Sequence, residues 1–110
     1  MKTITIRTSK GLKFFDTGNI LRIQGMSNYS KIFFADKSYP LTVAKVLLWF
    51  EKQLPVDGFW RTHKTHLVNS RYVKDLHTSP KPYLVLNNGE EVVISRRRIS
   101  FLRKIECTID

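Results

Sequence analysis

The sequence predicts a mainly β domain with one amphipathic helix and a short helix near the C-terminus. Two patterns support this fold class. Short runs of branched and aromatic residues alternate with Gly, Asn and Pro breaks along most of the chain. In one stretch the apolar spacing changes from that of a strand to that of a helix. The chain has 110 residues, 42% of them hydrophobic and 12% aromatic, which is enough for one core. No linker or composition shift marks a second domain, so residues 1–110 are expected to form one.

The expected strands follow one another through both halves of the chain. They are residues 3–7, 12–15, 20–23, 29–35, 59–63, 73–78, 83–86 and 92–94. The last two flank Asn88–Gly89, a dipeptide typical of the type I′ turn, and should form a hairpin. After strand 59–63 we expect a compact turn that runs through Leu67–Asn69.

The amphipathic helix is predicted over residues 43–54. Its apolar residues recur at helical spacing: Val43, Val46, Leu47, Phe50 and Leu54. Thr42 can cap the start, and Pro55 lies just past the end. Residues 41–43 can instead extend from the preceding turn. The helix is expected to pack on the core, because its polar face is too mixed in sign to follow phosphates.

The second, shorter helix is expected at about residues 97–106. Ile99, Leu102 and Ile105 would share one of its faces. Such a stripe is typical of core packing, so we interpret this helix as structural too.

Charge is the strongest compositional signal. Nineteen Lys and Arg against nine Asp and Glu give a net charge of +10. Residues 61–105 alone hold ten basic and three acidic residues. A solvated surface does not need this imbalance, and like charges repel one another in the folded state. A polyanionic partner, usually nucleic acid, accounts for it.

The chain carries no recognisable catalytic or cofactor motif. His63 and His66 have metal-compatible spacing, but no third ligand lies near them, and zinc sites need three or four. A phosphate-binding Gly-rich loop, a nucleophile elbow and a converging carboxylate pair are all missing from the sequence. We therefore expect a binding module without metal or cofactor, and not an enzyme.

The compartment follows from cysteine usage and hydropathy. Cys107 is the single cysteine, so no disulfide can form within the chain, which favours a reducing, cytoplasmic setting. The longest apolar stretch, Val46–Phe50, is far too short to cross a bilayer. No membrane association is expected.

Three polar clusters adjoin the expected strands: Ser27–Lys31, Arg61–His66 and Ser95–Arg98. Turn chemistry alone explains the first cluster. The third places three arginines at a helix start, where the helix dipole disfavours cations. A phosphate or base-edge partner would compensate for this, and Arg is well shaped for bidentate contact with guanine.

The second cluster carries a family resemblance. The run Phe59–Asn69, with an aromatic, Arg-x-His, a basic residue and Val-Asn in order, resembles the signature of the LytTR DNA-binding domain. Ile20–Ile32, around Asn28-Tyr29, resembles the family's strand–loop–strand. Gly89–Arg97 resembles its closing glycine, strand and Ser-Arg-Arg. Together these pieces cover nearly the whole chain.

The resemblance implies an elongated stack of antiparallel β-sheets that serves as the output module of bacterial two-component regulators. Such domains bind duplex DNA with loops in two successive major grooves, usually at paired short direct repeats. The candidate DNA-binding residues are then Asn28, Tyr29, Lys31, His63, Lys64, Arg96 and Arg97. Lys64 stands where the family often has Arg, which leaves the base it would contact open. Gln24 replaces a usual Glu, which we expect to be tolerated.

Partners follow from the same resemblance. Members commonly carry a receiver domain ahead of this module, whereas residue 1 here already begins the first strand. A second copy on an adjacent repeat and a signalling partner protein are both compatible with this arrangement. Two rival classes are a membrane-surface module, which needs exposed apolar anchors beside the cations, and an RNA-binding sheet of stacking aromatics. Phe14–Phe15 and Phe33–Phe34 are adjacent pairs, so one residue of each should point inward.

Overall fold

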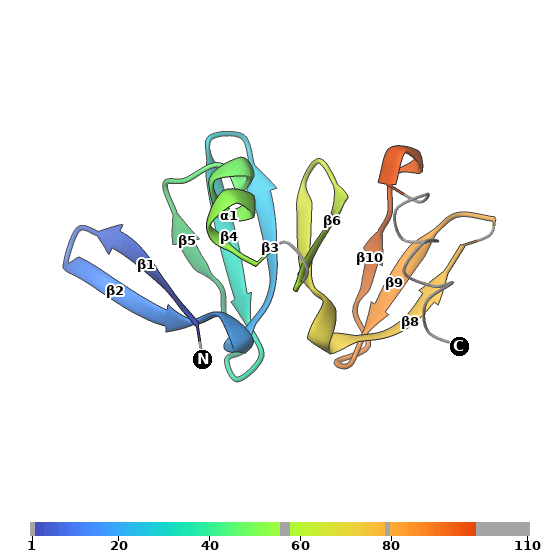
Figure 1. Ribbon diagram of the computed structural model, residues 1–110, viewed down its shortest axis with the longest axis horizontal. Helices are drawn as coiled ribbons and strands as arrows, with labels where there is room; N and C mark the ends of the chain where they lie inside the picture. The colour runs from blue at the N-terminus through green and yellow to red at the C-terminus, as the bar shows by residue number, and fades with distance from the viewer. Residues whose placement is uncertain (1, 56–57, 79, 99–110) are drawn as a thin grey trace.

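The computed structural model describes residues 2–55, 58–78 and 80–98, and their fold is mainly β, as predicted (Figure 1). In this part of the chain ten strands form three antiparallel sheets. The molecule is elongated, with extents of 44 × 29 × 25 Å.

The first sheet is a hairpin of β1 (Thr3–Thr8) and β2 (Gly11–Asp16). The second has the order β5-β4-β3-β7-β6 and contains β3 (Ile20–Met26), β4 (Tyr29–Phe34), β5 (Leu41–Val43), β6 (Phe59–His63) and β7 (His66–Asn69). The third has the order β10-β9-β8 and contains β8 (Val73–His77), β9 (Tyr83–Leu86) and β10 (Glu91–Val93). Two 3₁₀ turns, Thr17–Asn19 and Ser70–Tyr72, lead into β3 and β8. These strands confirm the expected ones.

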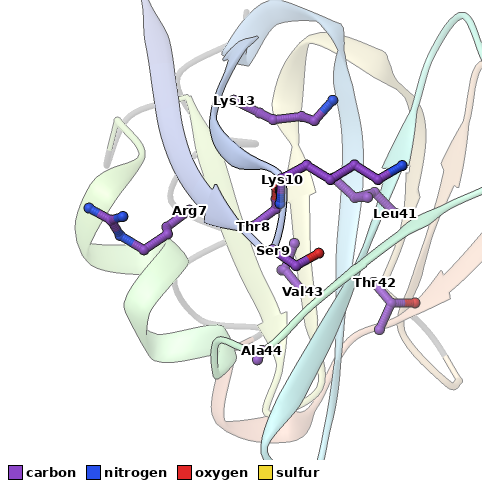
Figure 2. A pocket seen from close by; sticks show the side chains of 9 residues that line it. All are labelled: Arg7, Thr8, Ser9, Lys10, Lys13, Leu41, Thr42, Val43 and Ala44. Atoms are coloured by element: carbon purple, nitrogen blue, oxygen red, sulfur yellow. The ribbon is translucent and has the colours of Figure 1, made fainter.

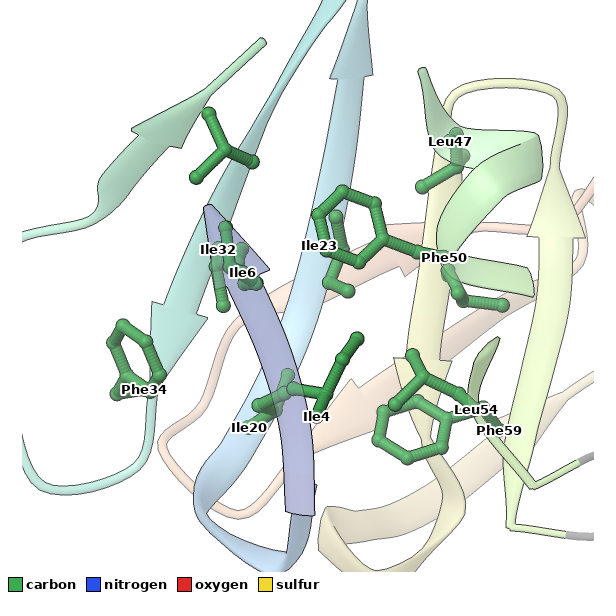
Figure 3. Close-up of a cluster of buried hydrophobic side chains, with 12 residues drawn as sticks. Ile4, Ile6, Ile20, Ile23, Ile32, Phe34, Leu47, Phe50, Leu54 and Phe59 are labelled. Atoms are coloured by element: carbon green, nitrogen blue, oxygen red, sulfur yellow. The ribbon is translucent and has the colours of Figure 1, made fainter. Parts of the chain in front are cut away.

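The five-stranded sheet lies between two hydrophobic clusters because its side chains point to both of its faces, with a β-bulge between Ile20 and Arg22 that shifts the alternation on β3. On β3, Ile20 and Ile23 enter the first cluster and Leu21 the second. On β7, Leu67 and Val68 divide in the same way. Figure 3 shows the first cluster, where the β1–β2 hairpin and the helix α1 (Leu47–Gln53) cover one face of the sheet. The second cluster joins the sheet to β8–β10. The expected stack of sheets is therefore confirmed.

The helix is shorter than predicted. It begins at Leu47, and the N-cap position is held by Val46, which makes no side-chain capping hydrogen bond, and not by Thr42. Residues 41–43 form strand β5, because pairing with β4 satisfies their backbone groups while Val43 still reaches the first cluster. Val46 is 46% exposed and does not belong to the apolar stripe. Leu47, Phe50 and Leu54 are buried, so the structural interpretation of α1 is confirmed.

Two predicted turns differ in detail. The turn after β6 is Lys64–Thr65, and Leu67–Asn69 form strand β7 because Leu67 and Val68 are core residues. The β9–β10 hairpin forms, but its turn is longer than the two-residue type I′ turn. Gly89 N–H donates to Leu86 O at 2.9 Å, and Gly89 has φ 90°. A type I turn followed by a glycine bulge fits these contacts.

Only the start of the C-terminal helix can be described. Arg96, Arg97 and Arg98 are helical, and residues 99–106 of the prediction lie outside the described residues. Among the described residues, no helix is long and apolar enough to cross a membrane.

Candidate nucleic-acid interface

The three polar clusters, far apart in sequence, lie along one edge of the stack (Figure 1). This edge is formed by the β3–β4 turn, the β6–β7 turn and the helical segment Arg96–Arg98. Two backbone hydrogen bonds join them. Gly25 N–H, just before the first turn, donates to Thr65 O at 2.9 Å. Ser95 N–H donates to Thr62 O at 2.7 Å. We call this surface the loop edge.

The β3–β4 turn contains only Ser27 and Asn28. Met26 pairs with Tyr29 across its base, and Ser27 has φ 56°, a left-handed conformation that a non-glycine residue rarely adopts. Asn28 is exposed, whereas Tyr29 is half-buried. Asn28 is thus the candidate at the tip of this turn, with Tyr29 at its base.

Lys31 follows two residues further along β4 and is half-buried. Since alternate residues share a face of a strand, Lys31 and Tyr29 lie on the same face. Ser30 between them is buried on the other face, where its hydroxyl donates to Lys45 O at 2.7 Å. This bond ties β4 to the segment that precedes α1.

The β6–β7 turn, Lys64–Thr65, is held from below by Arg61. The Arg61 guanidinium donates to His63 O at 2.9 Å and to Lys64 O at 2.7 Å. Its third contact is an ion pair with Glu51 on α1. These bonds satisfy the carbonyls of the turn and leave the Lys64 side chain exposed. Thr62 is fully buried, so the protruding part of this cluster is smaller than the polar run 62–66.

His63 is oriented by the same turn. Its Nδ1 accepts a hydrogen bond from Thr65 N–H at 3.2 Å and lies 2.9 Å from the Thr65 hydroxyl. The neutral ring must then carry its proton on Nε2, which makes Nε2 a donor. A donor at this place can serve a phosphate oxygen or guanine.

His66 differs from His63. Burial, together with the positive charges of Arg22 and the neighbouring His63, lowers the pKa of His66 to about 4. Its Nδ1 is buried and has no hydrogen-bond partner in the part of the chain that the structure describes. The two rings are 5.7 Å apart, but the described residues contain no group of three or more His, Cys, Asp or Glu that could hold a metal ion. His66 therefore belongs to the support of the turn and not to its exposed tip.

The third cluster faces the second across a pocket. Arg98 N–H donates to Ser95 O at 3.0 Å, which starts the helical segment. The pocket, about 370 Å³ in volume, is lined by His63, Lys64, Ser95, Arg96, Arg97 and Arg98. Arg96 and Arg97 are exposed, and Arg98 is half-buried. The fold thus gathers four cations and one histidine around a single hollow, an arrangement suited to an anionic ligand.

Several residues of the sequence signature support the fold and are not exposed on the loop edge. Asn69 is buried, where its amide donates to Ile20 O at 2.8 Å and its oxygen accepts from Arg71 N–H at 3.0 Å. Trp60 packs on the second hydrophobic cluster, and Val68 belongs to it. The signature therefore combines a scaffold with one exposed tip.

Sequence reasoning missed two supporting arginines. By sequence Arg61 is the first residue of the polar cluster Arg61–His66, whereas in the structure its guanidinium turns inward to two carbonyls and Glu51. Arg22 bridges two sheets: it donates to Glu90 at 3.2 and 3.1 Å and lies 3.8 Å from the centre of the Phe33 ring. Its hydrogen bonds lower the pKa of Glu90. Arg22 alternates with apolar residues on β3, a signal for partial burial that could have identified it.

The comparisons with known proteins agree with the fold. A family model described as the LytTr DNA-binding domain matches residues 10–106. The chain is 25% identical over 104 residues to the sensory transduction protein LytT of Bacillus subtilis strain 168. That match covers 93% of this chain and 42% of LytT, so the chain spans less than half the length of this relative.

A solved structure shows the same fold. The LytTr DNA-binding domain of a protein from Bacillus cereus superposes with a TM-score of 0.77 at 24% identity, covering 94% of this chain and 95% of that one. The family match extends over most of the chain, including all three clusters of the loop edge. The chain belongs to the LytTR family of DNA-binding domains.

Proposed function

We propose that this domain regulates transcription by reading duplex DNA with its loop edge, as a binding module and not as an enzyme. The β3–β4 and β6–β7 turns would enter successive major grooves, and Arg96 and Arg97 would contact the DNA beside them. The proposed contact residues are Asn28, Tyr29, Lys31, His63, Lys64, Arg96 and Arg97.

One observation carries the proposal: two backbone hydrogen bonds bring together three polar clusters that are far apart in sequence. Gly25 N–H donates to Thr65 O, and Ser95 N–H donates to Thr62 O. Side chains positioned by a rigid β scaffold can read base edges without a recognition helix.

Within this edge we assign different roles to the candidates. Lys64, exposed on a clamped turn, can reach guanine O6 and N7 as a point charge. Arg97 is proposed to contact a base or the backbone, and Arg98 to position a phosphate. Paired direct repeats, a second copy of the domain and a signalling partner remain part of the same proposal, as does a cytoplasmic location.

Competition binding tests the ligand class. Labelled duplex DNA carrying a selected site is competed with unlabelled duplex DNA, duplex RNA and anionic vesicles. We expect only duplex DNA to compete at low concentration. If about six phosphates are neutralised, affinity should fall on the order of a thousandfold between roughly 50 and 200 mM salt. A flat salt response, or equal competition by RNA, would contradict the proposal.

A matched pair of variants tests the location. Lys64→Ala with Arg97→Ala removes two cations from the loop edge, and Lys37→Ala with Lys74→Ala removes two exposed cations from other parts of the surface. Lys37 lies between β4 and β5, and Lys74 lies near the start of β8; in Figure 1 both segments are at the opposite edge. We expect the first pair to abolish sequence preference and the second to preserve it. Equal losses would show that net charge alone governs binding.

A further inference from the structure

The outer face of the β1–β2 hairpin is exposed and apolar. Strand register places Leu12 opposite Arg7, and Phe14 opposite Thr5. Phe14 is 68% exposed and Leu12 is 52% exposed. The inner face of the same hairpin carries the buried Ile4 and Ile6. The fold therefore explains the inner apolar residues but gives Leu12 and Phe14 nothing to pack against among the described residues.

This hairpin is also strongly basic. Lys2, Arg7, Lys10 and Lys13 lie within residues 2–15, which contain no Asp or Glu. The first acid, Asp16, already accepts a hydrogen bond from Gly18 N–H at 2.9 Å. Arg7, Lys10 and Lys13 line one pocket of about 510 Å³ together with the β5 segment, and in Figure 2 the Arg7 side chain points away from the two lysines. Because Arg7 pairs with Leu12 across the hairpin, it lies on the outer face with Leu12 and Phe14.

We propose that the outer face, defined by Thr5, Arg7, Leu12 and Phe14, binds an acidic segment of a partner protein that carries apolar side chains. The apolar groups would cover Leu12 and Phe14, and a carboxylate would pair with Arg7 in a bidentate contact. Aromatic residues and Arg are the side-chain types enriched among the dominant contacts of protein interfaces. The proposal concerns a surface separate from the loop edge and does not depend on the proposed DNA contacts.

The chemistry of the face distinguishes this partner from three others. DNA phosphates would satisfy Arg7 but would leave Leu12 and Phe14 uncovered. A membrane needs more apolar area than two side chains supply for stable attachment. A second copy of the chain would bring the same cations together, and like charges at an interface oppose association. An acidic partner satisfies both the charge and the apolar surface.

The position of the hairpin allows both partners at once. In Figure 1 the β1–β2 hairpin lies at one end of the stack, and the helical segment Arg96–Arg98 lies toward the other. The domain could therefore hold DNA on the loop edge while the outer face engages the partner.

The test uses a synthetic peptide of about twelve residues that alternates Glu with Leu, because extended segments present alternate side chains to a sheet face. The peptide is titrated into isotopically labelled protein, first alone and then with DNA bound, and amide shifts are followed by NMR. We expect shifts confined to residues 3–16, with DNA still bound. Phe14→Ser and Arg7→Glu should each weaken peptide binding about tenfold, as loss of a dominant interface contact does. Both side chains are exposed, and thermal melting verifies that the variants fold.

Lys13→Glu is the matched control, because Lys13 pairs with buried Ile6 and lies on the other face of the hairpin. It carries the same charge change as Arg7→Glu and should retain peptide binding within about twofold, since the charge lies outside the contact. If Arg7→Glu and Lys13→Glu weaken peptide binding equally, net charge alone explains the binding, and the proposal is overturned. Displacement of DNA by the peptide, or Phe14-dependent binding of phosphatidylserine vesicles, would also overturn it. Failure of DNA binding alone would affect only the proposed function.

Discussion

The β6–β7 and β3–β4 turns have the same length and lie on the same edge, yet they are held differently. Arg61 bonds two carbonyls of the β6–β7 turn and connects them to Glu51 on α1. The β3–β4 turn has no such clamp among the described residues, and its Ser27 adopts a left-handed φ of 56°. The β6–β7 turn is preorganised by these bonds. We expect the β3–β4 turn to adapt its shape more readily, which would suit one fixed reader and one adjustable contact.

The two turns nevertheless share a support. Helix α1 contributes Glu51 to the β6–β7 turn, and its Leu47 packs against Gly25 at the base of the other. A Cβ added to Gly25 would lie 3.1 Å from the Leu47 Cβ. Small movements of α1 should therefore affect both turns.

The largest expected effect comes from removing this shared support. Phe50 is fully buried on α1, so Phe50→Ala should lower the free energy of unfolding by about 3–5 kcal/mol, through lost burial and the cavity left behind. Urea unfolding measures the change. A variant with normal stability and no DNA binding would mean that α1 is a recognition element and not a shared support of the two turns.

The next effect should separate the turns. Arg61→Ala removes hydrogen bonds to two carbonyls and the ion pair with Glu51, and should cost about 1.5–3 kcal/mol of stability, the range for bonds to charged groups. DNA affinity should fall further than Lys64→Ala alone lowers it, because the whole turn loses its position. Amide shifts should change in residues 63–66 and stay constant at Ser27 and Asn28. Equal changes in both turns would contradict separate clamping.

Substitutions of Lys64 test whether the β6–β7 turn, which Arg61 holds in place, reads a base. As a base reader, Lys64→Ala should cost about 1–3 kcal/mol of binding to the preferred site and relax one base pair in a randomised-site selection. Lys64→Arg should retain or sharpen that preference, because Arg can form a bidentate contact. An unchanged preferred sequence with a salt slope lower by about one would reassign Lys64 to a phosphate.

The support of the β6–β7 turn should also be sensitive to acid. His66 has a folded pKa of about 4 against an ordinary value of 6.5, so the unfolded chain binds the proton more readily between these values. Stability should be complete above pH 6.5 and fall as the pH decreases toward 4. Urea unfolding across this range should show the slope, and His66→Gln should flatten it.

Glu90 provides the control for that experiment. Its pKa is lowered from an ordinary value of 4.5, so its contribution is lost only at still lower pH. Glu90→Gln should leave the slope between pH 6.5 and 4.5 in place. Loss of the slope in Glu90→Gln, with retention in His66→Gln, would reverse the assignment.

The smallest effect concerns the unclamped turn. Ser27→Gly should relieve the left-handed strain and change stability by less than about 1 kcal/mol, because glycine gains freedom in the unfolded chain as well. DNA affinity should fall slightly if the shape of this turn matters, and the same change should leave the preference at the Lys64 base pair intact. A large loss of affinity would show that the β3–β4 turn is as preorganised as its neighbour.

The sequence predicted the strands well. It predicted the start of the helix and the positions of the turns less well. Neighbouring residues of a strand point to opposite faces, and Ile20 and Leu21 accordingly enter different core clusters. Such residues could be assigned to a strand from the sequence. Residues 41–43 carry both helical and strand patterns, and only pairing with β4 decided between them. The expected turn after β6 lies too late in the sequence. Only Asn69 of Leu67–Asn69 is a residue typical of turns, and in the structure Asn69 is buried and donates to Ile20 O.

The sequence by itself determined the fold class, the family, the excess of positive charge and the polar clusters from which DNA contacts are proposed, since these depend on local pattern and composition. The tertiary structure alone decided which clusters meet, because the bonds from Gly25 to Thr65 and from Ser95 to Thr62 join segments about thirty to forty residues apart. It also decided the roles of arginines that look alike in sequence. Arg61 and Arg22 find carbonyl and carboxylate partners and become supports, while Arg96 and Arg97 stay exposed. Burial with a partner, and not residue type, separates a structural cation from one that is available to DNA.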